Sequence, residues 1–186
     1  MTFHPARRLF HASGIVFVLA YQGLDLGRPL VAGLSWGVVA VLLLFDLLRN
    51  RFPHVQATFQ AAFKVLLQPK DERGLNTSTL YFAGCAMAVT LVPAAPACGG
   101  ILALALGDPL AAIVGSSVRS PRWNKTSVAG SAACFAAALL ACRIFVPWPT
   151  ACAGAATATL LEAVSGAKLD NFTMPVGVAL VLAWLS

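Results

Sequence analysis

The chain of 186 residues is strongly apolar and weakly charged, with 59% hydrophobic residues, 11% charged residues and a mean hydropathy of +0.79. This composition is typical of a polytopic membrane protein. The formal net charge of +6 comes from basic residues dispersed among loops, which argues against a nucleic-acid partner. We therefore expect an all-α fold in which residues 1–186 form one integral-membrane helical bundle.

Seven apolar segments predict transmembrane helices, because a bilayer core of roughly 30 Å needs about 20 helical residues. They cover 9–24, 29–48, 77–93, 97–117, 127–146, 150–164 and 172–186. The last two segments are short, which leaves six spans as an alternative. Prolines stand at the joints, where they start or end helices without breaking one: Pro29, Pro93, Pro96, Pro147 and Pro149.

Residues 52–68 differ from the spans. Their apolar side chains recur at three- and four-residue spacing with polar ones between them. This pattern predicts one amphipathic helix, either lying in the cytoplasmic interface or docked on the other spans.

The basic residues predict the orientation. With a cytoplasmic N-terminus, every lysine and arginine except Arg28 and Arg143 falls on the cytoplasmic side. The positive-inside rule then places the C-terminus outside. All carboxylates except Asp25 gather on the cytoplasmic side too, as expected for a site that handles anionic substrates. Ion pairing explains Asp71 and some others, but not Asp108 and Glu162, which fall within apolar stretches.

The segment around Asp108 carries the strongest local chemistry. Gly107-Asp108-Pro109 interrupts an apolar run, and aspartate before proline is typical of a helix start. We expect a second half-helix to begin here inside the membrane domain. Its free N–H groups would attract phosphate, and Asp108 would hold a metal ion that bridges phosphates. Small residues at every fourth position predict close helix packing along this segment: Ala103, Gly107, Ala111 and Gly115.

Two later segments add charged candidates. Lys125, with Arg119 and Arg122 before it, precedes a helix expected to start near Thr126 or Ser127, an arrangement that suits a polyphosphate. A positive-inside loop explains these cations equally well. Glu162 lies about one turn from the cytoplasmic end of its span without a structural explanation, whereas Asp170 or Asn171 is expected to cap the last helix.

Several segments together resemble a known family. LFDLLR, ALGDPLAAIVG, SVAGS and EAVSGAKLDNFTMP are similar, in order, to motifs of the membrane lipid kinases that include dolichol kinase, phytol kinase and the CTP-dependent diacylglycerol kinase. That family is related to phosphatidate cytidylyltransferase. The opening RRLFHASG resembles the family's Arg-Lys-x-x-His, with Arg8 replacing lysine. Two departures are a Lys125 one position farther from Gly130 than usual, and the lack of the cytidylyltransferase C-terminal signature.

The resemblance implies a kinase in a bacterial inner membrane, with a cytoplasmic site, that transfers the γ-phosphoryl of CTP or another nucleoside triphosphate to a lipid alcohol such as phytol or a polyprenol. It implies Mg²⁺ held by Asp108 with Glu162 or Asp170, and an alcohol proton accepted by Asp46 or Asp170. Alternatives are a diacylglycerol kinase, a phosphatidate cytidylyltransferase and a small transporter. The expected nucleotide or phosphate ligands are Arg7, Arg8, Arg49, Gly107, Gly115, Lys125, Gly130, Ser131 and Asn171. Two further candidate site residues are His11 and Glu72.

Overall fold

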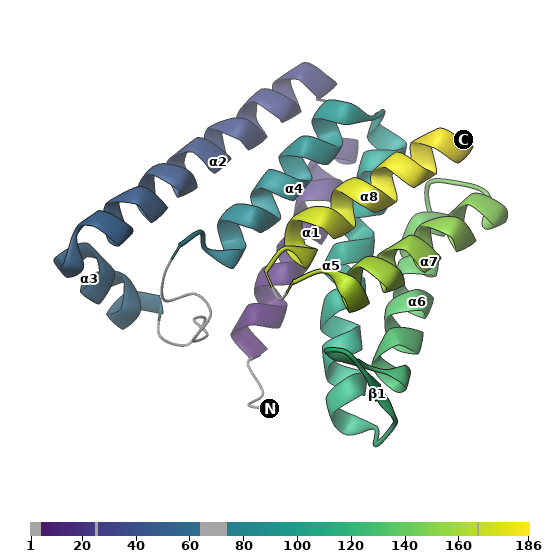
Figure 1. Ribbon diagram of the computed structural model, residues 1–186. Coiled ribbons are helices and arrows are strands. Elements are labelled where there is room, and N and C mark those ends of the chain that lie inside the picture. The colour runs from purple at the N-terminus through teal and green to yellow at the C-terminus, as the bar shows by residue number, and fades with distance from the viewer. Residues whose placement is uncertain (1–4, 25, 64–73, 167) are drawn as a thin grey trace.

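The computed structural model describes the backbone of residues 5–24, 26–63, 74–166 and 168–186, and the side chains of these ranges from residue 10 onward, except that of residue 63. The described ranges are almost entirely helical (Figure 1). The predicted all-α fold is confirmed. The helices are α1 (Pro5–Gly23), α2 (Arg28–Arg51), α3 (Pro53–Phe63), α4 (Thr77–Leu91), α5 (Ala94–Ser117), α6 (Val128–Arg143), α7 (Trp148–Val164) and α8 (Asp170–Leu185).

A small antiparallel hairpin separates α5 from α6. Its strands are β1 (Arg122–Trp123) and β2 (Thr126–Ser127), and Trp123 pairs with Thr126. Ser127 also caps α6, because its side chain accepts a hydrogen bond from the Gly130 backbone N–H at 3.1 Å. The predicted start of this helix near Thr126 or Ser127 is therefore confirmed.

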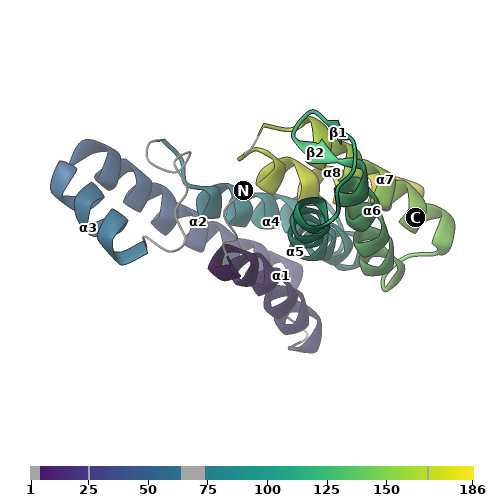
Figure 2. The ribbon, with the colours of Figure 1, turned by 90° about the horizontal axis from the view of Figure 1, so that it is seen from below.

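The helices form two crossing layers (Figures 1 and 2). In one layer α2, α4, α8 and α7 lie side by side in that order, and in the other α5 lies between α1 and α6. The layers meet where α5 packs on α8 and α6 packs on α7. Because α5 and α8 occupy central positions, side chains on these two helices come within reach of most other elements.

Helix length decides which segments could cross a membrane. Among the described helices, α2 and α5 are long and apolar enough to do so. The apolar helices α4, α6 and α8 have 15, 16 and 16 residues. At 1.5 Å per residue they reach about 22–24 Å, short of a core of roughly 30 Å. Two candidate spans are weak support for a membrane protein, since buried core helices and signal sequences pass the same test; the seven predicted spans are not confirmed.

The prediction of a helix break at Asp108 is wrong. Helix α5 runs without interruption from Ala94 to Ser117, with Pro109 inside it. Proline removes one backbone hydrogen bond and its ring crowds the carbonyl four residues earlier, but α5 is held by its packing on α1, α6 and α8. No second half-helix begins at Asp108, so no set of free N–H groups is available there for phosphate.

The cap predicted for α8 is also wrong. Leu169 is the N-cap residue and makes no side-chain cap hydrogen bond, while Asp170 is the first helical residue. The Asp170 carboxylate nevertheless accepts from the Asn171 N–H at 2.9 Å, so it satisfies one donor of the first turn. Pro175 lies inside the helix and not in its first turn.

Small residues allow the central helices to approach closely. A Cβ atom added at Gly100 of α5 would lie 2.9 Å from the Ala179 backbone nitrogen of α8, and nearer still to the Pro175 carbonyl oxygen. Backbone atoms of a packed helix cannot move aside as a flexible side chain can. Glycine at this position is therefore required by the α5–α8 contact.

This contact gives a stability prediction. Replacing Gly100 by alanine is expected to destabilise the protein by about 1–3 kcal/mol through overpacking, measured as a lower melting temperature in detergent. Gly37→Ala on α2 is the matched control, because a Cβ atom there meets nothing within 4 Å. That variant is expected to be neutral or more stable by up to ~1 kcal/mol, since alanine favours helix. Equal melting temperatures for the two variants would contradict the proposed close packing.

Candidate functional site

The structure brings four charged side chains together from four different elements. They are Asp108 of α5, Lys125 at the hairpin tip, Glu162 near the end of α7 and Asp170 at the start of α8. The charges of Lys125, Asp108 and Asp170 all act on the Glu162 carboxyl. The Lys125 ammonium donates to Asp170 Oδ2 at 2.5 Å. We call these four residues the carboxylate cluster.

The hairpin explains how Lys125 reaches this cluster. Asn124 adopts a left-handed backbone conformation with φ of 56°, which asparagine tolerates better than most residues. Its side-chain amide donates to the Ala163 carbonyl at 2.8 Å, directly after Glu162. This bond fixes the hairpin tip on the end of α7, and Lys125, the next residue, then reaches Asp170. The unusual spacing of Lys125 from Gly130 therefore does not keep it from the site.

Glu162 is the side chain least explained by structural needs. It is buried, and its Oε2 atom has no hydrogen-bond partner among the described residues. A buried carboxylate oxygen without a donor is unfavourable and calls for an explanation such as a bound cation. The predicted role of Glu162 as a metal ligand is consistent with this orphaned oxygen.

The donor chemistry of the cluster fits Mg²⁺. Magnesium prefers oxygen ligands and is usually held by one or two carboxylates together with waters and substrate phosphates. Within the described residues, no group of three or more His, Cys, Asp or Glu is arranged to hold a metal. The orphaned Glu162 oxygen and the nearby Asp108 are the two oxygen donors that the described part of the cluster could offer to such an ion.

His11 lies beside Asp108. Its Nδ1 atom is 3.6 Å from Asp108 Oδ2, and the imidazole is buried while the Asp108 side chain is 28% exposed. The Tyr81 hydroxyl donates to the His11 carbonyl at 3.1 Å, and the two rings pack edge to face. His11 of α1 thus contacts both Asp108 of α5 and Tyr81 of α4.

Asn171 and Ser131 lie next to the cluster. Asn171 donates through its side chain to Asp170 Oδ1 at 2.7 Å, while its own Oδ1 atom has no partner among the described residues. The Ser131 hydroxyl is hydrogen-bonded to Thr126, the residue after Lys125, at 2.5 Å. Asn171 thus contacts a member of the carboxylate cluster directly, and Ser131 contacts the residue next to Lys125.

The three predicted phosphate-binding glycines occupy packing positions. A Cβ atom at Gly107 would lie 3.2 Å from the Cys134 sulfur of α6. One at Gly115 would lie 3.4 Å from the Gly130 Cα atom, and the reverse distance is the same. Helices α5 and α6 therefore cross at these glycines, as the small-residue pattern on α5 predicted.

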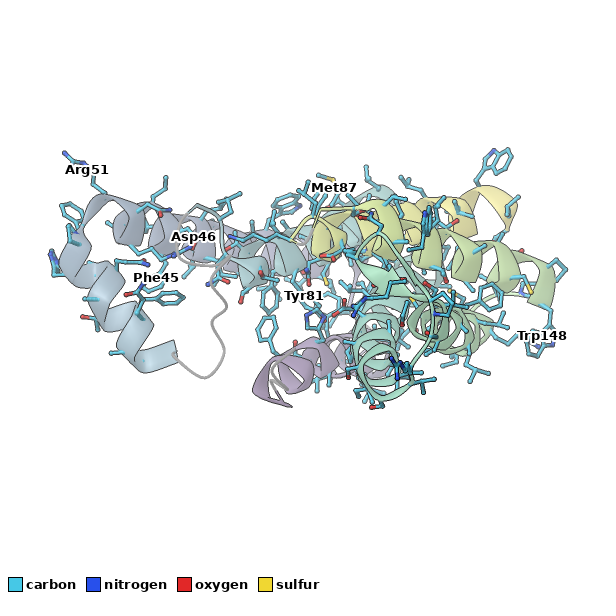
Figure 3. All side chains as sticks on the ribbon, turned by 60° about the horizontal axis from the view of Figure 1, so that its bottom comes forward. Phe45, Asp46, Arg51, Tyr81, Met87 and Trp148 are labelled. Atoms are coloured by element: carbon cyan, nitrogen blue, oxygen red, sulfur yellow. The ribbon has the colours of Figure 1, made fainter. Side chains whose placement is uncertain are left out.

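Asp46 and Arg49 form a separate network at the junction of α2, α3 and α4. Arg49 Nε donates to Asp46 Oδ1 at 2.7 Å, and Asp46 Oδ2 accepts from the Asn76 backbone N–H and the Thr79 hydroxyl at 2.8 and 2.7 Å. Arg49 also donates to the Gly74 carbonyl. Asp46 lies on the α3 side of the molecule (Figure 3). Both residues are thus engaged in joining helices, away from the carboxylate cluster.

Three predicted residues cannot be placed. Arg7 and Arg8 lie in the first turns of α1, and their side chains are outside the described set. Glu72, with the neighbouring charged residues of 64–73, lies outside the described residues altogether.

Sequence reasoning missed the hairpin and Asn124. The available signal was a two-residue segment, Asn124-Lys125, between Trp123 and Thr126, because asparagine between β-favouring residues is typical of a tight hairpin turn. Four strand residues are too few to stand out from a loop by periodicity alone.

Comparison with known proteins adds one relative. No protein-family model matches the chain, and no solved structure matches it. An uncharacterised protein of Rickettsia prowazekii (strain Madrid E) is 28% identical over 140 residues, which are 74% of this chain and 68% of that protein. The name of that protein carries no activity.

Proposed function

We propose that the protein is an integral-membrane kinase that transfers the γ-phosphoryl of a nucleoside triphosphate to the hydroxyl of a lipid alcohol. The observation that carries the proposal is the carboxylate cluster, in which Asp108, Lys125, Glu162 and Asp170 converge from four elements. CTP as donor and an isoprenoid alcohol such as phytol as acceptor follow from the sequence resemblance.

Exposed apolar surface supports a membrane location. Helix α2 turns many large apolar side chains outward, and few of its residues are buried. Apolar surface of this extent is unusual on a soluble monomer and marks contact with lipid or a partner. The proposal includes seven spans, α3 in the interface, a cytoplasmic N-terminus and a bacterial inner membrane. The exposed α2 side chains include Leu30, Leu34, Val41, Leu44 and Leu47.

The proposed mechanism depends on positioning and charge neutralisation, which dominate phosphoryl transfer. Asp108 and Glu162 would hold Mg²⁺, which neutralises charge on the transferred phosphoryl group. Lys125 has two further N–H donors beyond the one given to Asp170, and these would bind phosphate oxygens. Asp170, oriented by Lys125 and Asn171, would accept the alcohol proton on Oδ2. This role goes to Asp170 and not to Asp46, because Asp46 belongs to the separate network with Arg49 and Thr79, away from the carboxylate cluster.

The proposed topology can be tested directly. A reporter fused after Ser186 is expected outside the cytoplasm and one fused at position 70 inside, because the basic residues segregate to one side. Alkaline phosphatase and fluorescent-protein fusions would report the two compartments. A cytoplasmic reporter after Ser186 would contradict seven spans and point to an even number.

The proposed activity can be tested with labelled nucleotides. Purified protein in detergent would receive γ-labelled CTP or ATP with phytol, geranylgeraniol, a polyprenol, diacylglycerol or phosphatidate. We expect a labelled isoprenoid phosphate and a preference for CTP. Equal use of both nucleotides would remove the CTP preference alone. Release of pyrophosphate from CTP with phosphatidate would instead identify a cytidylyltransferase, and transfer to none of the alcohols would contradict a lipid kinase.

A further inference from the structure

An apolar groove runs between α6 and α7 beside the hairpin, with a volume of about 450 Å³. The residues that line its α6 wall recur three and four positions apart in the sequence, and those of its α7 wall follow the same spacing. Each wall is therefore one continuous helix face. On α7 this face consists of Ala156, Thr159, Leu160 and Ala163; on α6 it consists of Val128, Ser131 and Phe135, and the hairpin adds Trp123 and Thr126.

The polar end of this groove adjoins the carboxylate cluster. Thr159 and Ala163 stand on either side of Glu162 along α7, and Thr126 directly follows Lys125. Cys134 connects the two regions, because the Thr159 hydroxyl and the charges of Glu162 and Asp108 all act on its thiol. A ligand lying in the groove would therefore have one end at the charged groups.

The rest of the groove is apolar and open. Trp123, Val128 and Leu160 are exposed at its rim, while Thr126 is buried and satisfied by its bond to Ser131. Its volume lies in the lower half of the ~300–1,000 Å³ range of small-molecule sites. An apolar site of this size beside a charged centre suits one hydrocarbon chain with a polar head, and not two chains.

We infer that the α6–α7 groove binds the single hydrocarbon chain of the acceptor alcohol and directs its hydroxyl to the carboxylate cluster. This inference rests on the proposed kinase function and extends it, because it selects single-chain alcohols over diacylglycerol. The chain enters sideways through the open rim between Val128 and Leu160.

Photo-crosslinking tests the groove without any nucleotide. A C15 prenyl alcohol with a diazirine at the far end of its chain would be bound to the full-length protein in nanodiscs and its adducts mapped by mass spectrometry. We expect adducts on the α6 and α7 walls. Ala156→Trp fills the groove and should reduce labelling at least ~10-fold, because the indole occupies the space that the chain would take. Ala136→Trp, at an exposed alanine of α6 outside the groove, should leave labelling unchanged.

A second pair of variants covers the case in which Ala156→Trp does not fold. Leu160→Asp places a charge on the exposed groove rim, and Leu140→Asp places one on an exposed part of α6 away from it. Leu160→Asp should abolish labelling, and Leu140→Asp should leave it unchanged. A diacylglycerol bearing the same diazirine should label at least ~10-fold less than the prenyl alcohol, because the groove has room for one chain and not for two.

The possible outcomes distinguish a failure of the groove inference from a failure of the kinase proposal. Adducts on other helices, or labelling unaffected by both Ala156→Trp and Leu160→Asp, would overturn the groove even if the protein phosphorylates alcohols. Equal labelling by diacylglycerol would overturn the selection of single chains. Groove adducts that these variants remove would support chain binding even if no phosphoryl transfer is found with any nucleotide, in which case the kinase assignment alone fails.

Discussion

Replacing Asp108 by asparagine is expected to reduce phosphoryl transfer at least ~100-fold, because a metal ligand and a preorganised charge supply several kcal/mol of transition-state stabilisation. The substitution keeps the shape of the side chain and removes its charge. Asp108 is 28% exposed and its recorded ion-pair partner is His11, so folding and insertion should be normal. Transfer would be measured with labelled nucleotide at saturating Mg²⁺ and folding by the melting temperature.

Two comparisons sharpen this result. Asp46→Asn makes the same chemical change in the network between α2 and α4 and should affect stability more than turnover at equal amounts of folded protein. Lys125→Ala should reduce activity less than Asp108→Asn, since it leaves both proposed Mg²⁺ ligands, Asp108 and Glu162, in place. If Asp108→Asn retains near-normal transfer while remaining folded, the carboxylate cluster is not the nucleotide site.

Replacing Asp46 by alanine is expected to lower the free energy of unfolding by about 3–5 kcal/mol, the range found when one partner of a buried ion pair is removed. Arg49 is 1% exposed and Asp46 is 2% exposed, so the guanidinium would keep its charge in a buried place. The Asn76 N–H and the Thr79 hydroxyl would also lose their acceptor. Chemical denaturation in detergent, followed by tryptophan fluorescence, would measure the change.

A double-mutant cycle isolates the ion pair. Arg49→Met with Asp46→Ala should be less destabilising than the sum of the two single variants, because the double variant leaves no unpaired buried charge. Strict additivity would contradict a direct ion pair. If Asp46→Ala melts normally but loses phosphoryl transfer, Asp46 accepts the alcohol proton as the sequence resemblance implied, and the assignment to Asp170 is wrong.

The helices were predictable because their signals are local. Apolar runs bounded by proline or a capping side chain mark the segment predicted at 150–164 and observed as Trp148–Val164, with Pro147 as its N-cap. The segment predicted at 97–117 likewise ends where α5 ends, at Ser117. Such boundaries depend on a few neighbouring residues, which a single sequence displays directly.

The site was predictable only in part, because its grouping depends on contacts between distant residues. From the sequence, Asp46 and Asp170 were equally good candidates for the same role. In the structure Thr79, 33 residues away, engages Asp46, and Lys125, 45 residues away, engages Asp170. The break expected at Asp108 failed for a related reason. A local preference against proline in a helix was outweighed by packing of α5 on three neighbours that its own sequence does not reveal.

The place of α8 between α4 and α7 has a consequence for biosynthesis. The ribosome makes α8 after its three main neighbours, α4, α5 and α7, so the slot that it fills stays empty while the intervening chain is made. At ~5–20 residues per second, the interval from the end of α4 to the start of α8 lasts roughly 4–16 s. During this time the helix faces around Gly84 and Gly100, which α8 covers in the folded protein, have no α8 to pack against. The insertion of α8 between α4 and α7 therefore has to follow the synthesis of all three of these neighbours.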